Sequence, residues 1–456
     1  MRPELLRRRR HALRRTTACC SLVVGLSVVV SGPIASGSAA TSGQSGAAAQ
    51  NPSDQAAQQS AMQIFDSFST ASTPPDSTYV DPDPSTTYDP HPAVTSVQKT
   101  LEGLAPEQFG GIYQTKDGVV HVGIVGDMSA PTGAATAAAP SDELQFPAQH
   151  TWADLQAISD QLTAEMASNP SGGLVSVSAD AETNRVDVGV SDVTSPLAQS
   201  IKTEYGDAIA IFADDPIEPL VGVYPDRDKY HQPGYAGLNI YLPKNAPRAA
   251  GRACTDGFGY HANPTGISDE RGFYTAGHCV YDLLPTQEWN QGGQRFGVYT
   301  RNGFRAKSNC DCGTITTDNT STITFRHSSN IVAIAPGVHP VHITRREAVN
   351  SGQKGDVIEV SGARSGLVVG TITVGGQGET HLFGGTIPLR HLYVAELSSP
   401  VYPGDSGAPV FQGPDFNGQA TAIGILLGRD PKDFKKIYFS QNAWVEFQLR
   451  VTTSTS

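Results

Sequence analysis

Two short motifs, far apart in the sequence, constrain this chain more than any other feature. The first reads Thr-Ala-Gly-His-Cys at 275–279, and the second reads Pro-Gly-Asp-Ser-Gly at 403–407. A serine hydroxyl becomes a useful nucleophile when a base takes its proton and backbone donors receive the developing negative charge. We expect His278 to be the base and the amides of Gly404 and Ser406 to be the donors. Glycine at 404 is expected to allow the turn and to spare the substrate from crowding by a side chain.

Each motif alone has an ordinary explanation, because Gly-Asp-Ser-Gly is common turn sequence and a single histidine is usually structural. Their combination with a third acidic residue is more informative. Asp311 opens the apolar run Asp-Cys-Gly-Thr-Ile, which gives the chain order His, Asp, Ser. The competing residues Asp318 and Asp356 do not open a comparable run. We therefore predict a catalytic triad of His278, Asp311 and Ser406.

Together these motifs resemble the chymotrypsin-like serine peptidases, in particular the secreted bacterial streptogrisins and alpha-lytic protease. The resemblance covers about 234–450 by motif and, more loosely, 93–232 by layout. It implies an all-β catalytic domain of two packed six-stranded antiparallel β-barrels, preceded by a smaller α/β pro-domain. It also implies a serine endopeptidase that forms an acyl-enzyme with protein or peptide substrates and needs no cofactor or metal. We expect it to be a monomer.

The resemblance also implies a disulfide between Cys254 and Cys279, beside the expected base. A second pair, Cys310 and Cys312, flanks Asp311. An oxidised Cys-x-Cys ring would fix that loop, whereas two thiolates alone make a poor zinc site. The sequence leaves the state of this second pair open.

Two positions depart from the pattern of the resembling family. Val360 stands where the bacterial relatives carry an arginine that pairs with the aspartate before the nucleophile, here Asp405. A buried unpaired carboxylate is costly, so we expect Arg364, another cation or water to compensate. Leu427 stands near a serine that supports the triad aspartate in relatives, so Asp311 is expected to be held less well. These departures favour the alternative of a weak or inactive peptidase fold that binds peptides or cell surfaces.

The N-terminus predicts export. Residues 1–40 begin with an arginine-rich stretch, continue with an apolar run of about 13 residues, and end in small residues. This is typical of a secretory signal peptide, and the run is short for a membrane span, although an uncleaved anchor is the alternative. We expect a secreted, extracellular protein with no membrane attachment after cleavage. The net charge of −12 argues against a nucleic-acid partner.

Residues 41–92 are poor in apolar side chains and are predicted to be a disordered linker. Residues 93–235 alternate helical and strand periodicity, with strands near 120–124 and 186–190 and a last helix at 196–205. The resemblance makes this α/β unit a pro-domain that aids folding and inhibits the enzyme. Slow folding of a strand-dominated domain supports such a role. A permanent accessory binding domain, or two domains that never separate, are the alternatives.

The peptidase domain is predicted to span 236–456, with processing near Tyr235 or Ala236. The wall of its main substrate pocket is expected at 422–429. Four basic residues follow in or after that wall, namely Arg429, Lys432, Lys435 and Lys436. They either favour acidic side chains in the substrate or form a solvated loop, which is the ordinary outcome for a run of charges.

Overall fold

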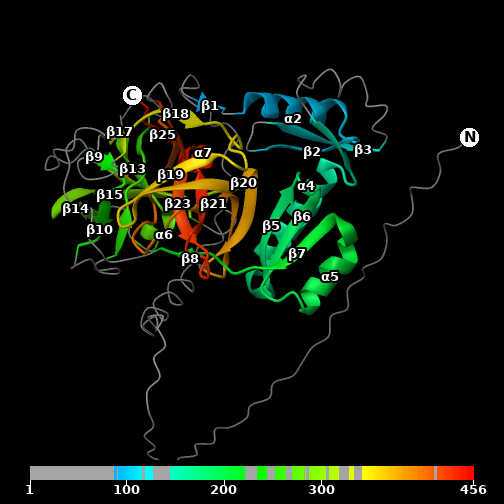
Figure 1. Cartoon of the computed structure of the whole chain (residues 1–456). Coiled ribbons are helices and arrows are strands. Elements are labelled where there is room, and N and C mark those ends of the chain that lie inside the picture. The colour runs from blue at the N-terminus through cyan, green and yellow to red at the C-terminus, as the bar shows by residue number, and fades with distance from the viewer. Residues whose placement is uncertain are drawn as a thin grey trace, which may run out of the picture. The chain divides into compact units, whose positions relative to one another are not determined.

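The computed structural model describes most of the chain after residue 86 (Figure 1). The described ranges are 87–89, 91–115, 119–126, 144–220, 234–243, 252–262, 270–281, 283, 287–304, 308–317, 328–332, 341–414 and 419–455. The predicted signal peptide and most of the predicted linker lie outside them. Among the described residues, no helix is long and apolar enough to cross a membrane.

The described residues up to 220, here called the N-terminal part, mix helices and strands as the sequence predicts. Its elements are β1 (Thr87–Tyr88), α2 (Pro92–Leu104), β2 (Phe109–Gln114), β3 (Val120–Val125), β4 (Leu144–Ala148), α4 (Trp152–Ser168), η2 (Pro170–Gly172), β5 (Leu174–Asp180), β6 (Arg185–Val190), α5 (Pro196–Tyr205), η3 (Gly206–Ala208), β7 (Ile209–Ala213) and β8 (Glu218–Pro219). Strands β2, β3 and β4 form one sheet, and β7, β6 and β5 are neighbours in another.

Local sequence explains where the helices of this part begin. The side chain of Thr151 accepts a hydrogen bond from the Asp154 amide at the start of α4. Ser195 does the same for α5 by accepting from the Ala198 amide, and Pro196 occupies the first turn. The alternating valines of β6 are buried in the same apolar cluster as the buried face of α4, which fixes the helix on the sheet.

One end of the predicted linker is ordered, which corrects the prediction of disorder for 41–92. Thr87 and Tyr88 form a parallel pairing with Arg346 and Glu347 of β18, and α2 already begins at Pro92. Composition misses this strand because backbone groups, rather than apolar side chains, hold it to its neighbour.

The described residues from 234 onward, here called the C-terminal part, are almost entirely strands, as predicted for the catalytic domain. Its elements are β9 (Gly234–Ala236), β10 (Asn239–Tyr241), β11 (Ala253–Thr255), β12 (Gly259–Ala262), β13 (Glu270–Thr275), α6 (Gly277–Val280), β14 (Glu288–Gln291), β15 (Gln294–Asn302), β16 (Gly313–Thr316), β17 (Ser328–Val332), β18 (Val341–Glu347), β19 (Val357–Gly362), β20 (Gly366–Phe383), β21 (Ile387–Leu397), β22 (Pro409–Gln412), β23 (Ala420–Arg429), β24 (Lys436–Gln441), α7 (Asn442–Leu449) and β25 (Thr452–Thr453).

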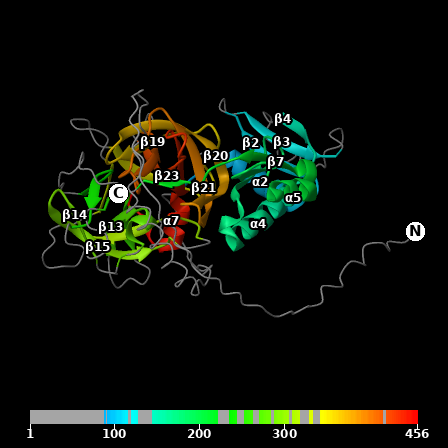
Figure 2. The same cartoon turned by 90° about the horizontal axis from the view of Figure 1, so that it is seen from below.

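The strand count differs from the predicted two sets of six. One antiparallel sheet has eight strands in the order β11-β10-β14-β15-β16-β13-β12-β25, of which Figure 2 shows β13, β14 and β15 in one group. One of its two additional strands is β25, which pairs with β12. The other strands belong to a sheet of fourteen. That each sheet closes as a barrel stays a prediction.

The larger sheet runs through both parts of the chain. Thr380 and His381 of β20 pair antiparallel with Val177 and Ser176 of β5, so the order continues as β7-β6-β5-β20-β19 (Figure 1). Pairing of exposed strand edges joins segments through backbone hydrogen bonds. The N-terminal part is therefore attached to the β20–β21 hairpin by a shared sheet.

Candidate active site

The three predicted triad residues sit at the ends of paired strands. His278 lies in the short helix α6, directly after β13, and Asp311 lies just before β16. Because Thr275 of β13 is opposite Gly313 of β16, both residues lie at the same end of this sheet. Ser406 comes from the turn between β21 and β22 in the other sheet.

The structure brings these three side chains into hydrogen-bonding distance. The His278 ring places Nδ1 2.5 Å from Asp311 Oδ2 and Nε2 2.9 Å from Ser406 Oγ. The His278 amide also donates to Asp311 Oδ1 at 2.7 Å. In the tautomer that donates from Nδ1 to the Asp311 carboxylate, the Nε2 lone pair faces the hydroxyl. This arrangement lets the imidazole take the serine proton.

Glycine at 404 is required for the backbone turn, as the sequence predicted. Its φ of +109° lies in the region that side chains disfavour, which accounts for glycine. A Cβ built there would meet nothing within 4 Å among the described residues, and crowding of a substrate by a side chain stays a prediction. The predicted role of its amide fits the geometry, because Gly404 N donates to the carbonyl oxygen of Leu220 at 2.6 Å. The role of the Ser406 amide stays a prediction.

A segment of the chain itself crosses the site, and the sequence did not predict it. Residues 217–220, here called the docked segment, contain β8, which pairs antiparallel with β23, with Glu218 opposite Arg429 and Pro219 opposite Gly428. On its other side, the Ile217 amide donates to the Leu382 carbonyl at 2.8 Å. An extended peptide held between two strands, with its last described carbonyl on the Gly404 amide, has the geometry of a bound substrate. No motif in the sequence marks it.

The last residue of the docked segment enters the core. Leu220 is fully buried and belongs to an apolar cluster that also contains Val360, Ala408, Ile423 and Leu426. Val360, which replaces the relatives' arginine, is therefore part of the apolar cluster around this leucine.

Backbone groups compensate Asp405, where the sequence had led us to expect Arg364, another cation or water. Its Oδ1 accepts from the amides of Arg364 at 2.8 Å and Ser365 at 3.1 Å, and its Oδ2 accepts from the Tyr402 amide at 2.8 Å. Burial raises the pKa of this carboxyl above its usual range, and the three amides oppose the rise.

The Arg364 side chain contacts the backbone next to Gly404. Its Nη1 donates to the Pro403 carbonyl at 3.3 Å, and that carbonyl shares a peptide plane with the Gly404 amide. Because the N–H and the carbonyl of a trans peptide point in opposite directions, this contact aims the Gly404 N–H at the Leu220 carbonyl.

Replacing Arg364 with alanine is expected to lower kcat about 10-fold with little change in KM, since the oxyanion donor loses its orientation. Steady-state kinetics on a peptide substrate would measure this. An Arg295→Ala variant is the control, because Arg295 pairs with Glu288 in the β14–β15 hairpin. A change in KM alone would contradict the positioning role of Arg364.

Support for Asp311 comes from a residue that sequence reasoning missed. Ser440 Oγ of β24 accepts a hydrogen bond from the Asp311 amide at 3.0 Å. The Leu427 carbonyl, at the position expected to weaken the aspartate, accepts from Ser406 Oγ at 3.4 Å. Asp311 is fully buried. Weaker support of the Asp311 carboxylate, as expected from Leu427, stays a prediction, because the contact with Ser440 is made by the backbone amide of Asp311.

Both cysteine pairs are joined. The bridge between Cys254 and Cys279 ties β11 to α6, the helix that carries the expected base. Cys310 and Cys312 are also bonded, which closes a ring around Asp311. Among the residues that the structure describes, no cluster of potential metal ligands occurs.

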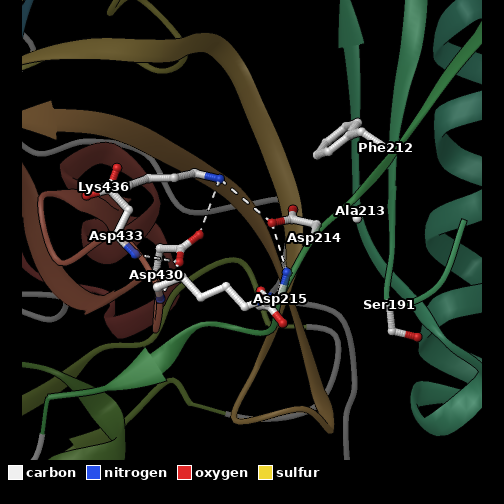
Figure 3. Close-up of a pocket in the computed structure, with 9 residues that line it drawn as sticks. Ser191, Phe212, Ala213, Asp214, Asp215, Asp430, Asp433 and Lys436 are labelled. Carbon is white, nitrogen blue, oxygen red and sulfur yellow. Dashed lines mark hydrogen bonds and ion pairs between the residues drawn. The ribbon is translucent and has the colours of Figure 1, made fainter. Parts of the chain in front are cut away.

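The predicted basic loop faces acidic residues of the N-terminal part. Lys432 and Lys436 lie by Asp215 and Asp214, at 2.5 Å and 3.8 Å between the charged atoms. These groups line a hollow of about 350 Å³ that Figure 3 shows. Lys435 is exposed, so the solvated-loop interpretation holds for that residue, whereas Arg429 is buried.

Acidic groups and a histidine gather where β5, β6 and β20 meet. Burial, followed by the charges of Asp180 and Glu379, raises the pKa of Asp187 to about 6. For His381, burial by itself lowers the pKa, but the hydrogen bond and charge of Glu379 and the charge of Asp214 raise it overall. Its ring lies 2.8 Å from Glu379 Oε1 and 2.9 Å from the Asp215 carbonyl oxygen.

Both shifts predict that the uncleaved chain loses stability as pH rises. A carboxyl with a raised pKa stabilises the fold in its protonated form, so the Asp187 contribution disappears between about pH 4 and pH 6. We expect the free energy of unfolding to fall by about 1–2 kcal/mol less over this pH range in Asp187→Asn than in its parent. Denaturant unfolding in a Ser406→Ala background would measure it, with exposed Asp160→Asn as control. Equal pH profiles for Asp187→Asn and its parent would refute this.

Comparisons with known proteins place structural similarity in one half of the chain. No protein-family model matches the chain, and no curated protein matches it in sequence. Thermobifida fusca Protease A is 22% identical over 49% of this chain and 98% of its own, with a TM-score of 0.36. A Nocardiopsis protease is 21% identical over 48% and 98%, with the same TM-score. A glutamic acid specific serine protease is 22% identical over 48% and 100%, also at 0.36.

Proposed function

We propose that this protein is a secreted serine endopeptidase made as a zymogen. Ser406 attacks the carbonyl carbon of the substrate, and His278 takes its proton and then gives it to the leaving amine. Asp311 orients the imidazole and stabilises its cation. The amides of Gly404 and Ser406 hold the oxyanion, and water then hydrolyses the acyl-enzyme.

One observation carries this proposal. A backbone carbonyl, that of Leu220, accepts a hydrogen bond from the Gly404 amide at 2.6 Å. In the same site, the expected base lies 2.9 Å from the serine hydroxyl. A peptide carbonyl on an expected oxyanion donor, together with a nucleophile paired to a base, supports the machinery of acyl transfer.

The same contacts support a pro-domain that inhibits the enzyme. The docked segment belongs to the N-terminal part and occupies the place of a substrate, so no other peptide can bind there while it stays. The pairing of β5 with β20 supports a role as folding aid, because a preformed edge aligns a long hairpin of the C-terminal part. Two packed barrels and a monomeric enzyme remain parts of the proposal.

The test compares wild type with Ser406→Ala, both expressed with the signal peptide. We expect the wild type to be secreted as two fragments and the variant to stay joined, as read from intact mass. The processed wild type should react with a serine-directed phosphonate at Ser406. Ser398→Ala is the matched control, since Ser398 is exposed and outside the site.

A second candidate function, a peptidase fold kept for binding, rested on Val360 and Leu427. Such a protein would not react with the phosphonate, and wild type and Ser406→Ala would be cut alike by an outside peptidase. That pair of results would overturn the proposal.

A further inference from the structure

We infer that the enzyme prefers substrates whose residues before the cleaved bond match the docked segment, in the order apolar, acidic, proline, leucine. We also infer that Arg429 selects the acidic residue. The inference rests on the proposed peptidase function and names its substrate class. Residues 217–220 occupy the four positions before the cleaved bond, in the order Ile, Glu, Pro, Leu.

One contact shows which residue of the docked segment lies just before the bond to be cut. The carbonyl on the Gly404 amide is that of Leu220, so Leu220 holds the position just before the cut. Ser406 Oγ bonds to the Leu220 carbonyl carbon, and the bond from that carbon to the next nitrogen breaks. The nitrogen takes its proton from His278, and water later releases the acid from Ser406.

The position before the cut favours an apolar side chain. Leu220 has no exposed surface and belongs to a buried apolar cluster with Val360, Ala408 and Leu426. A charged side chain there would lose its hydration without a partner. The fourth position is apolar as well, because Ile217 joins a cluster with Phe304, Phe383 and Leu427.

Charge is recognised at the third position before the cut, which Glu218 occupies. Arg429 Nε lies 2.9 Å from Glu218 Oε2. The arginine is 6% exposed and is fixed from two other sides, because its Nη1 donates to the Val401 carbonyl at 2.6 Å and its guanidinium lies 3.7 Å from the Phe434 ring centre.

A guanidinium that is held in place from two other sides is a ready-made site for a carboxylate. Arginine offers its donors in a rigid fork that matches the two carboxylate oxygens. When the docked segment leaves, Arg429 keeps the Val401 carbonyl and the Phe434 ring but loses the Glu218 carboxylate. A substrate with glutamate in that position restores the ion pair, whereas lysine would meet repulsion.

The inference also places the first self-cleavage at a different bond from the one predicted from the sequence. The resemblance predicted processing near Tyr235 or Ala236, but these residues lie in β9, which pairs with β17 of the C-terminal part. Ala236 is 1% exposed. The bond presented to Ser406 is the one on the carboxyl side of Leu220, so the mature chain is expected to begin 15 residues or so earlier than the sequence predicted.

The experiment uses the processed wild-type enzyme and three acetylated p-nitroanilide peptides, Ile-Glu-Pro-Leu, Ile-Gln-Pro-Leu and Ile-Lys-Pro-Leu. We expect kcat/KM to fall about 10-fold from the glutamate to the glutamine peptide, and further for lysine, since a charge-assisted contact is lost. Terminal sequencing of the large fragment should show a chain that begins directly after Leu220.

An Arg429→Gln variant tests the residue itself, with Lys435→Gln as a matched loss of charge nearby. We expect Arg429→Gln to cleave the glutamate and glutamine peptides within about 2-fold of each other, while Lys435→Gln keeps the preference. Labelling by a small phosphonate at the wild-type rate checks that the variant is folded. If the variant does not fold, the comparison of the three peptides with the wild-type enzyme still tests the inference.

Several results would overturn the inference. Equal cleavage of all three peptides with normal labelling of Ser406 would show that Glu218 and Arg429 serve only to dock the N-terminal part. A first cut near Tyr235 or Ala236 would show that the docked segment is not a substrate. No labelling and no cleavage of any peptide would instead mean that the proposed peptidase function fails.

Discussion

Replacing Asp311 with asparagine is expected to slow self-cleavage and peptide hydrolysis about 10,000-fold, as removal of the carboxylate does in triads of this kind. Asp311 Oδ2 accepts the Nδ1 proton of His278 at 2.5 Å and so keeps Nε2 free to take the Ser406 proton. An amide in its place would present N–H to Nδ1, and the ring would carry its proton on Nε2. Timed intact-mass measurements on the full chain would follow self-cleavage.

Asp356→Asn is the matched control. Asp356 competed with Asp311 for the role of triad aspartate in the sequence analysis, and it lies among the residues that the structure describes. Its carboxylate lies 2.9 Å from the ring of His91 in the N-terminal part, away from the triad contacts. We expect it to cleave itself at close to the wild-type rate. Comparable losses in both variants, or none at Asp311, would refute the predicted triad.

Gly428→Ala is expected to block the docked segment and peptide substrates together, with kcat/KM for the tetrapeptides falling more than about 100-fold. A Cβ at this position would overlap Ile217 Cγ2 and would lie 2.7 Å from the Glu218 carbonyl oxygen. Backbone atoms cannot move away while the strand pairing is kept, so the added methyl group prevents the antiparallel contact with β23.

The triad is untouched in this variant, which makes the result specific. A small phosphonate, which needs no contact with β23, should still label Ser406. Gly103→Ala, at a glycine whose added Cβ would meet nothing within 4 Å, is the control and should cleave itself normally. Loss of labelling in Gly428→Ala would mean that the site as a whole had collapsed, contrary to this prediction.

The sequence by itself led to the candidate triad. His278, Asp311 and Ser406 were predicted because a nucleophile, a base and an orienting acid need these residue types in motifs with few other uses. Periodicity also gave the α/β character of the N-terminal part, including the last helix at Pro196–Tyr205. These features depend on side chains and on contacts close in the chain, which leave a readable pattern.

Only the tertiary structure decided what surrounds the triad. Three backbone amides compensate Asp405, and every residue except proline carries such an amide, so the sequence contains no signal for them. The placement of Leu220 on the Gly404 amide and of Glu218 beside Arg429 joins positions about two hundred residues apart. Such contacts depend on strand pairing between distant segments, which local patterns do not specify. The residue types therefore predicted the reaction, whereas the paired strands decided which peptide the site holds.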